Sequence, residues 1–183
     1  MARCIPSACS KALLGASLLL GPARANPWQQ ARFPVPQFSG YTSHYGPRSG
    51  ASGGSSLHRG LDIAAPLGSP VLSWWAGRVE RLINDGSCGI GVAIRSGPYE
   101  HLYCHLQGTI EQNTLRSGGA SLRQGSWLRT GEPLGAIGVS GRSSGPHLHW
   151  GVKLNERWLD PVLLLRAMAD ARRVETPISQ ARP

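Results

Sequence analysis

Glycine and proline interrupt this chain at short intervals, and that spacing constrains its fold more than any other feature. Twenty-four glycines and 14 prolines are spread over 183 residues, and both residue types are unfavourable inside a helix. Helix-period runs of apolar residues are scarce before the C-terminus, which favours short strands joined by turns. We therefore predict one all-β or β-dominated domain, built on an antiparallel, sandwich-like sheet, with a short C-terminal helix.

The expected strands follow the alternation of apolar side chains. They comprise Val71-Leu72, residues 77–83, the segment with Ile90, Val92 and Ile94, a return strand over 100–106, and the segment with Leu148, Trp150 and Val152. Asp160 and Pro161 suit the cap and the first position of the C-terminal helix. The polar segment 107–124 is expected to be a long surface loop. We place the domain over residues 41–173, after an extended lead-in over 26–40, with a Gly/Ser-rich loop over 46–56.

The first 25 residues have the three-part pattern of a secretory signal peptide. Arg3 and Lys11 precede a short apolar run over residues 12–21, and Ala23-Arg24-Ala25 forms an A-x-A cleavage site. The run is about half of the roughly 20 residues that cross a bilayer, so a membrane anchor is the weaker alternative. We predict export, cleavage after Ala25 and a periplasmic or extracellular location. Residues 174–183 are expected to be a disordered tail.

The chain without residues 1–25 is still basic. That segment holds three of the 19 basic residues and no acidic one, which leaves 16 basic against 10 acidic residues and a net charge of +6. A basic surface suits an anionic partner, and export favours a polymer of the cell envelope over nucleic acid. The alternative is that the charge only aids solubility. We expect a monomer without a stable membrane anchor.

Two histidine-containing segments offer metal ligands. In the strand-like segment His147-Leu148-His149, side chains two residues apart point to the same face. His58 and Asp62 are four residues apart, but Gly60 between them and the Ala-Ala-Pro that follows argue against a helix there. Each segment alone is weak evidence, because paired histidines are often solvated and an aspartate often caps a turn. Together they supply the three protein ligands of a catalytic zinc site, with one histidine to spare.

Three blocks of this sequence resemble, in order and spacing, the signature blocks of the lysostaphin/LytM metallopeptidases, peptidase family M23: HRGLDIAAPLGSPV, YCHL and SGRSSGPHLHWGV. The resemblance runs from about Tyr41 to Pro161 and implies a lysostaphin-like β fold. It also implies an exported zinc endopeptidase that hydrolyses peptide cross-links of bacterial peptidoglycan through a zinc-activated water. The implied metal ligands are His58, Asp62 and His149, which hold one Zn²⁺, and the implied catalytic residues are His105 and His147.

The residue types agree with that chemistry. Zn²⁺ polarises a scissile carbonyl and lowers the pKa of bound water, while one imidazole can take a proton and another can steady the oxyanion or protonate the leaving amine. The sequence leaves open which of His105 and His147 does which, and it has no H-E-x-x-H motif with a general-base glutamate. Two alternatives remain: an inactive relative that binds cell wall or activates an amidase, and a periplasmic metal-binding protein.

Two consecutive segments match the Y-x-H-L block, Tyr99 to Leu102 and Tyr103 to Leu106. Strand alternation predicts that His101 and His105 share one face about 13 Å apart, so only one of them reaches the metal site. We choose His105, because it lies farther from the tip of the hairpin. His101 is then expected at the surface or at the edge of the groove, where its loss costs little.

Cys88 and Cys104 remain after the predicted cleavage and are expected to form a disulfide. If the hairpin pairs Ile94 with Pro98 around a loop over 95–97, the same register places the two cysteines opposite each other. That register gathers both cysteines with Ile90, Val92, Leu102 and Leu106 on one apolar face, and His101, Tyr103 and His105 on the other. Opposed strand residues lie within disulfide range, and an exported protein meets an oxidising compartment. The alternative is a pair of buried thiols.

The chain departs from the family pattern in ways that concern specificity more than activity. Trp74-Trp75 stands where residues are commonly small, and residues 107–124 lengthen a connection. The tryptophan pair either packs in the core, or one of its rings lines the substrate groove. The sequence shows no separate module that targets the cell wall.

Overall fold

The computed structural model describes residues 26–49 and 55–173 of the chain. The predicted signal peptide over 1–25 and the predicted tail over 174–183 lie outside these residues. Within the part described, no helix combines the length and the apolar character that crossing a membrane requires.

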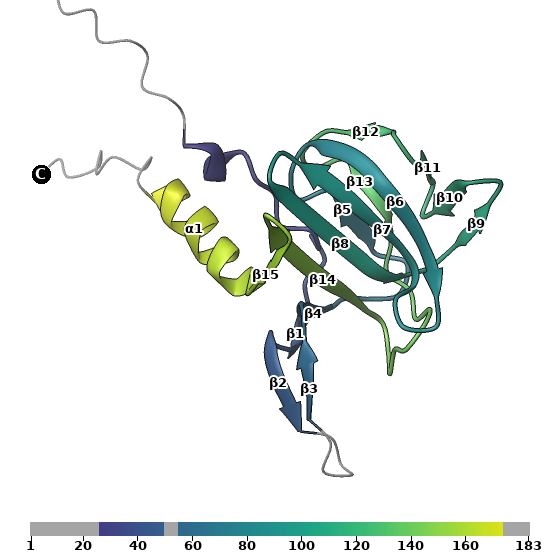
Figure 1. The fold of residues 1–183 in the computed structure, drawn as a ribbon, viewed down its shortest axis with the longest axis horizontal. Coiled ribbons are helices and arrows are strands. Elements are labelled where there is room, and N and C mark those ends of the chain that lie inside the picture. The colour runs from purple at the N-terminus through teal and green to yellow at the C-terminus, as the bar shows by residue number, and fades with distance from the viewer. Residues whose placement is uncertain (1–25, 50–54, 174–183) are drawn as a thin grey trace, which may run out of the picture.

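An antiparallel sheet forms the centre of the molecule (Figure 1). Over the described residues it has eight strands in the spatial order β1, β4, β14, β8, β7, β6 and β12, with β15 paired to β14. Their bounds are β1 Gly40–Ser43, β4 Leu61–Ala64, β6 Gly77–Asp85, β7 Gly89–Ser96, β8 Tyr99–Leu106, β12 Trp127–Leu128, β14 His147–Leu154 and β15 Arg157–Leu159. The predicted β-dominated, antiparallel fold is confirmed.

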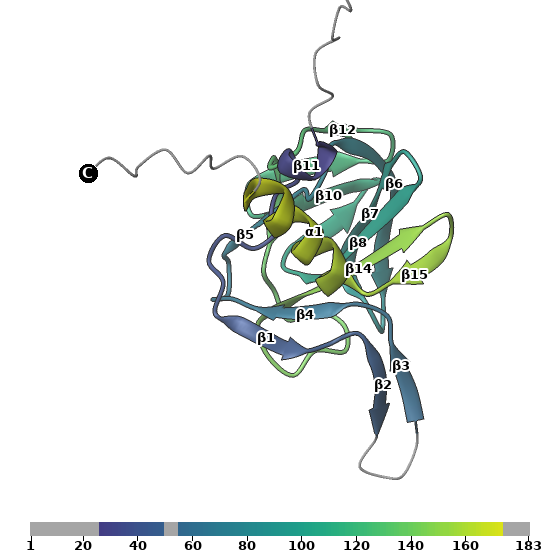
Figure 2. The same ribbon diagram turned by 90° about the vertical axis from the view of Figure 1, so that its left-hand side faces the viewer.

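Three smaller sheets flank the central one: β5 (Pro70–Leu72) with β13 (Pro133–Ala136), β9 (Thr109–Glu111) with β10 (Thr114–Ser117) and β11 (Ala120–Arg123), and β2 (Gly46–Ser49) with β3 (Ser55–His58). The prediction of a surface loop over 107–124 was therefore wrong. Leu115 and Leu122 alternate with polar residues in that segment and are buried, so they anchor its strands to the core. Of the loop predicted over 46–56, residues 46–49 and 55–56 are described and belong to the ribbon of β2 and β3, which projects from the sheet in both views (Figures 1 and 2).

The C-terminal helix α1 (Pro161–Arg173) begins where the sequence predicts. The backbone N–H of Val162 donates to the side chain of Asp160 at 2.9 Å, which caps the first turn. A 3₁₀ turn, η1 (Pro27–Gln29), lies beside α1 (Figure 2), and the Gln29 side chain donates to the carbonyl of Ala171 at 3.1 Å. Ala31 and Val35 are fully buried, so the segment expected to be an extended lead-in packs into the same core.

The largest buried side chains, Trp74, Trp150 and Tyr103, form the centre of the core. Trp74 lies 5.2 Å from Trp75 and 5.7 Å from Trp150, measured between ring centroids. Neither Trp74 nor Trp75 lines the groove described below. The tryptophan pair therefore packs in the core, which was the first of the two alternatives.

The hairpin of β7 and β8 has a different register from the one that the sequence suggests. Ser96 pairs with Tyr99 around a two-residue turn, and Ile94 pairs with His101 instead of Pro98. The turn is tight because Gly97 adopts a positive φ of 57°, which a glycine takes without steric cost. His101 and Tyr103 share one face of β8 and Leu102 and Cys104 share the other, as expected, but the first pair points into the core and the second lines the groove. Leu106 and His105 have changed sides relative to the expectation.

Candidate metal centre and active-site groove

Pairing between β4 and β14 brings the two histidine-containing segments together. Asp62 of β4 lies directly opposite His149 of β14 in the antiparallel register, and both side chains point away from the core. His58 ends β3, and the chain turns through Gly60 before β4 begins. A Cβ atom at Gly60 would lie 2.5 Å from Cε1 of His149. Only glycine therefore lets this turn pass so close to the ring of His149.

The side chains of His58, Asp62 and His149 converge on one point. His58 Nε2 is 3.0 Å from Asp62 Oδ1 and 2.9 Å from His149 Nδ1, and His149 Nδ1 is 2.8 Å from Asp62 Oδ1. A tetrahedral zinc with bonds of about 2.0–2.1 Å holds its ligand atoms about 3.3 Å apart. Slight outward movement of these three atoms would match that spacing.

The hydrogen bond of Nδ1 determines which nitrogen of the neutral His58 ring carries the proton. Nδ1 of His58 donates to the backbone carbonyl of His44 at 2.7 Å, so Nε2 carries a lone pair in the neutral ring. That lone pair faces an oxygen of Asp62 at 3.0 Å. Two electron-rich atoms at this distance need a proton or a cation between them, and a carbonyl partner behind a histidine is typical of metal ligands. The donor set therefore fits a zinc ion.

Asp62 is held from both sides. Its Oδ1 faces the two histidines, while Arg48 of β2 donates to Oδ2 at 2.6 Å. Burial by itself raises the pKa of the Asp62 carboxyl, but its close interactions with His149 and His58 outweigh that effect and leave the pKa well below its usual range. Asp62 is therefore an anion in this arrangement, as a metal ligand must be.

Two further histidines border the same point. His147 Nδ1 donates to the carbonyl of Gly145 at 2.8 Å, and its Nε2 lies 3.9 Å from Asp62 Oδ1. His105 Nδ1 donates to the carbonyl of Ser140 at 2.8 Å, and its ring centroid is 4.7 Å from that of His147. Burial lowers the pKa of His105. Both rings thus present Nε2 with a lone pair.

His101 is not where strand alternation places it. It is fully buried in the core, with a ring-centroid distance of 5.3 Å to Trp74. Its Nδ1 lies 2.7 Å from the hydroxyl of Tyr103, and its Nε2 lies 2.7 Å from the hydroxyl of Ser96. The expectations that His101 shares a face with His105, and that it lies at the surface, were wrong. The reason is a positive φ of 63° at His105, which breaks the alternation of β8.

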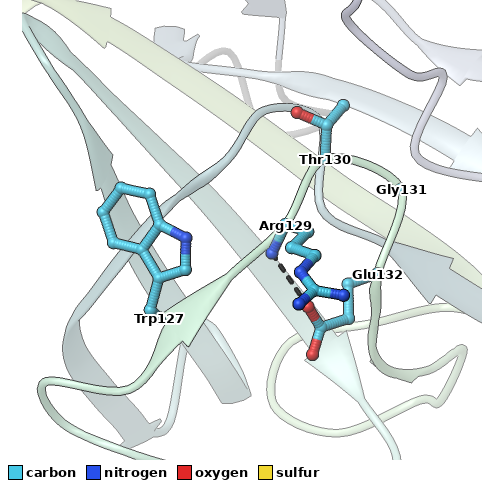
Figure 3. Close-up of a pocket in the computed structure, with 5 residues that line it drawn as sticks. All are labelled: Trp127, Arg129, Thr130, Gly131 and Glu132. Atoms are coloured by element: carbon cyan, nitrogen blue, oxygen red, sulfur yellow. Dashed lines mark hydrogen bonds between the residues drawn. The ribbon is translucent and has the colours of Figure 1, made fainter.

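These five candidate residues open onto one groove of about 470 Å³. The other residues that line it come from the β2–β3 ribbon, the turn between β6 and β7, strand β8, the 140–147 loop and β15: Arg48, Ser56, Leu57, Arg59, Asp85, Ser87, Cys88, Leu102, Cys104, Arg142, Ser144 and Trp158. A separate hollow beside β12 is lined by Trp127, Arg129, Thr130, Gly131 and Glu132 (Figure 3). It offers no imidazole or thiol, and its one marked hydrogen bond only closes a turn from the Arg129 N–H to Glu132.

Cys88 and Cys104 form the predicted disulfide, with their Cα atoms 4.8 Å apart. The prediction is confirmed, although the register on which it rested was wrong. Cys88 precedes β7, and its carbonyl accepts the backbone N–H of His105 at 2.9 Å, so the turn before β7 lies against β8 and its cysteine reaches Cys104.

Sequence analysis assigns no role to Arg48 or Ser140. Arg48 lies in a segment that reads as a Gly/Ser-rich loop, so a lone basic residue among small ones was the only available signal. Ser140 acts through its backbone carbonyl toward His105, and no side-chain pattern reveals a carbonyl's direction.

A family model and several known proteins match this chain in sequence. The model described as Peptidase family M23 matches residues 56–161. The DD-carboxypeptidase/endopeptidase Mpg of Neisseria meningitidis serogroup B is 37% identical over 107 residues, which are 58% of this chain and 22% of that protein. The peptidoglycan DD-endopeptidase ShyC of Vibrio cholerae is 31% identical over 121 residues, 64% of this chain and 25% of that protein. The chain thus spans about a quarter of the length of these relatives.

Solved structures agree on the fold. A zinc-containing peptidase from Vibrio cholerae superposes with a TM-score of 0.62 at 28% identity, covering 72% of this chain and 39% of that one. The catalytic domain of lysostaphin from Staphylococcus simulans gives a TM-score of 0.57 at 23% identity, over 70% and 92% of the two chains, and this likeness concerns the fold alone. With the match over residues 56–161, which contains all three sequence blocks, the chain belongs to peptidase family M23.

Proposed function

We propose that this protein is an exported zinc metalloendopeptidase that hydrolyses peptide cross-links of peptidoglycan. The observation that carries the proposal is the convergence of His58, Asp62 and His149 beside two further histidines with free Nε2 atoms. Relatives named as peptidoglycan DD-endopeptidases favour a D,D-cross-link as the bond that is cut. The same relatives support a periplasmic or extracellular location. Removal of the signal peptide after Ala25 is part of the proposal and rests on the pattern of residues 1–25.

In this proposal His58 Nε2, Asp62 Oδ1 and His149 Nδ1 hold the metal. When bound, Zn²⁺ supplies a Lewis acid for the scissile carbonyl and makes water a nucleophile near neutral pH. Arg48 keeps Asp62 oriented through Oδ2, and the carbonyl of His44 keeps His58 oriented through Nδ1. The three ligands would otherwise have rotamer freedom that weakens metal binding.

His105 and His147 carry the proton transfers. Each ring is fixed by a carbonyl on Nδ1, from Ser140 and Gly145 respectively, so each directs an unprotonated Nε2 toward the groove. One imidazole takes the proton of the attacking water on Nε2, and an imidazole that has gained a proton there can stabilise the oxyanion or pass that proton to the leaving amine. The low pKa of His105 keeps its ring neutral and able to accept a proton.

The shape of the site suits a polymer. Residues of the β2–β3 ribbon and of the 140–147 loop both line the groove. Its charged rim includes Arg48, Arg59 and Arg142, against Asp85, whose Oδ1 accepts the backbone N–H groups of two turn residues. An extended peptide that carries carboxylates matches this cationic opening.

Digestion of purified sacculi tests the proposal. Protein lacking residues 1–25 and loaded with one equivalent of zinc should release soluble muropeptides, and mass spectrometry should show D,D-cross-links broken into monomers. His147→Ala at equal zinc content serves as the matched control and should release far less. A chain that sediments with sacculi but releases nothing would instead be an inactive wall-binding protein, and a chain that does neither would also contradict the proposal.

A further inference from the structure

Strand β8 changes the direction of its side chains at one residue. Along an undistorted strand, neighbours point to opposite faces, yet Cys104 and His105 are consecutive and both line the groove. Tyr103 before them and Leu106 after them are both in the core. The exception coincides with His105, whose φ of 63° lies in the left-handed region. This backbone conformation is therefore what turns the His105 ring into the groove.

The same place is a β-bulge. Between the pairs Val92–Tyr103 and Ile90–Leu106, Gly91 alone on β7 faces Cys104 and His105 on β8. A Cβ atom at Gly91 would lie 2.5 Å from the Sγ of Cys88 and 2.6 Å from the carbonyl oxygen of Tyr103. The sulfur of Cys88 thus lies directly over the bulge, and glycine is required beneath it.

Two anchors hold the bulge from opposite sides. On one side, the disulfide joins Cys104 to Cys88, and the backbone N–H of His105 donates to the carbonyl of Cys88 at 2.9 Å. On the other side, the Ser140 hydroxyl donates to the carbonyl of Leu106 and accepts from the N–H of Ile90, both at 2.8 Å. The carbonyl of Ser140 accepts from the His105 ring itself.

We propose that the Cys88–Cys104 disulfide is a positioning element for His105: it holds the left-handed backbone that directs Nε2 of His105 into the groove. The proposal rests on the proposed function for the catalytic role of His105, but not for the geometry. A non-glycine residue pays a steric penalty in the left-handed region. Without the covalent tie from Cys104 to Cys88, β8 can relax toward regular alternation, which would turn the ring of His105 away from His147.

The kinetic test uses the double variant Cys88→Ala/Cys104→Ala in the full chain lacking residues 1–25. We expect kcat to fall by about 5- to 30-fold, the population factor that corresponds to one left-handed residue, with KM and zinc content unchanged. Leu164→Ala, which creates a cavity under helix α1 away from the groove, is the control for lost stability alone, and its kcat should stay near that of the wild type. Equal losses of kcat in the two variants, or none in the double variant, would overturn the proposal.

The structural test does not need activity. In protein with ¹⁵N-labelled histidine, the Nδ1–H of His105 that donates to Ser140 should give a protected signal, assigned by its absence in His105→Gln. The double cysteine variant should lose that protection, while the signals of His147 and His149 persist. If sacculi are not cut by the wild type but this change is seen, the proposed function fails and the positioning role stands. An unchanged His105 signal without the disulfide would refute the positioning role.

A second variant covers the case in which the double variant does not fold. Ser140→Ala removes the hydroxyl that ties Leu106 to Ile90 but keeps the carbonyl toward His105. With the disulfide intact, the His105 signal should be retained and kcat should fall by less than threefold, because the covalent anchor remains. Loss of the signal in this variant would assign the positioning to Ser140 and contradict the role of the disulfide.

Discussion

The buried histidine of β8 should make the stability of this protein sensitive to acid. The Ser96 hydroxyl donates to the carbonyl of Ala76 at 2.7 Å, so it can only accept from Nε2–H of His101. Nδ1 is then the acceptor for the hydroxyl of Tyr103, which in turn accepts from the N–H of Trp74 at 2.8 Å. In this series of hydrogen bonds, every donor has an acceptor only when the His101 ring is neutral. A second proton on its ring would face the hydroxyl proton of Tyr103.

The size of the effect follows from the pKa of His101. Burial lowers the pKa of His101 to about 3, while the charge of Glu100 raises it by a smaller amount and that of Arg95 lowers it further; an unfolded histidine has a pKa of about 6.5. Below about pH 6.5 the unfolded chain binds a proton that the folded chain does not bind until about pH 3. The contribution of neutral His101 to the free energy of unfolding is therefore fully present above pH 7 and declines as the pH falls. By pH 4 the loss amounts to about 3 kcal/mol.

Urea denaturation followed by tryptophan fluorescence measures this loss, with His101→Gln as the comparison. At pH 7 the variant should be less stable by about 1–3 kcal/mol, because it satisfies the hydroxyls of Ser96 and Tyr103 less well. Toward pH 4 the wild type should lose about 3 kcal/mol more than the variant, so the two should become equal or change order. Other titrating groups are common to both proteins and cancel. A stability difference that stays constant from pH 7 to pH 4 would refute a neutral, buried His101.

Four further predictions concern the site. His105→Ala should keep its fold and zinc yet hydrolyse sacculi roughly 10²–10⁴-fold more slowly, measured at equal zinc content. His149→Ala should bind less than one tenth of the zinc of the wild type by elemental analysis, whereas His44→Ala, which retains its carbonyl, should bind a full equivalent. Arg48→Gln should weaken zinc affinity about 10–100-fold in competition with a chelator, because Asp62 loses its outer partner. Complete removal of zinc by chelation should abolish hydrolysis, and added zinc should restore it.

The sequence proposes the metal-ligand candidates through the resemblance of its three blocks to peptidase family M23, while short-range rules support only parts of that set. Two histidines two apart on a strand share a face, and β4 and β14 are both short alternating segments that can pair with Asp62 opposite His149. The start of α1 at Asp160 and Pro161 follows from capping alone. The shared face of the two strand histidines and the start of the helix need only residues within one element, whereas the pairing of β4 with β14 joins residues 87 apart in the chain.

What the sequence does not predict depends on single backbone torsions. Gly97 closes the β7–β8 hairpin with two residues instead of three, which shifts the register of every residue behind it. The left-handed conformation at His105 then places the His105 side chain on the opposite face of β8 from His101. Neither torsion has a side-chain signature: Y-x-H-L occurs twice, and only the bulge selects the copy whose histidine faces the groove.

The distance along the chain between the candidate ligands has a consequence for how the protein folds. His58 and Asp62 are separated from His149 by 91 and 87 residues, so no local segment can gather the three side chains. They meet only after β14 has entered the sheet between β4 and β8, a pairing whose loop-closure entropy makes it slow. Metal added during refolding should therefore leave the folding rate unchanged and slow unfolding instead, because the ion stabilises only the state in which the sheet is complete.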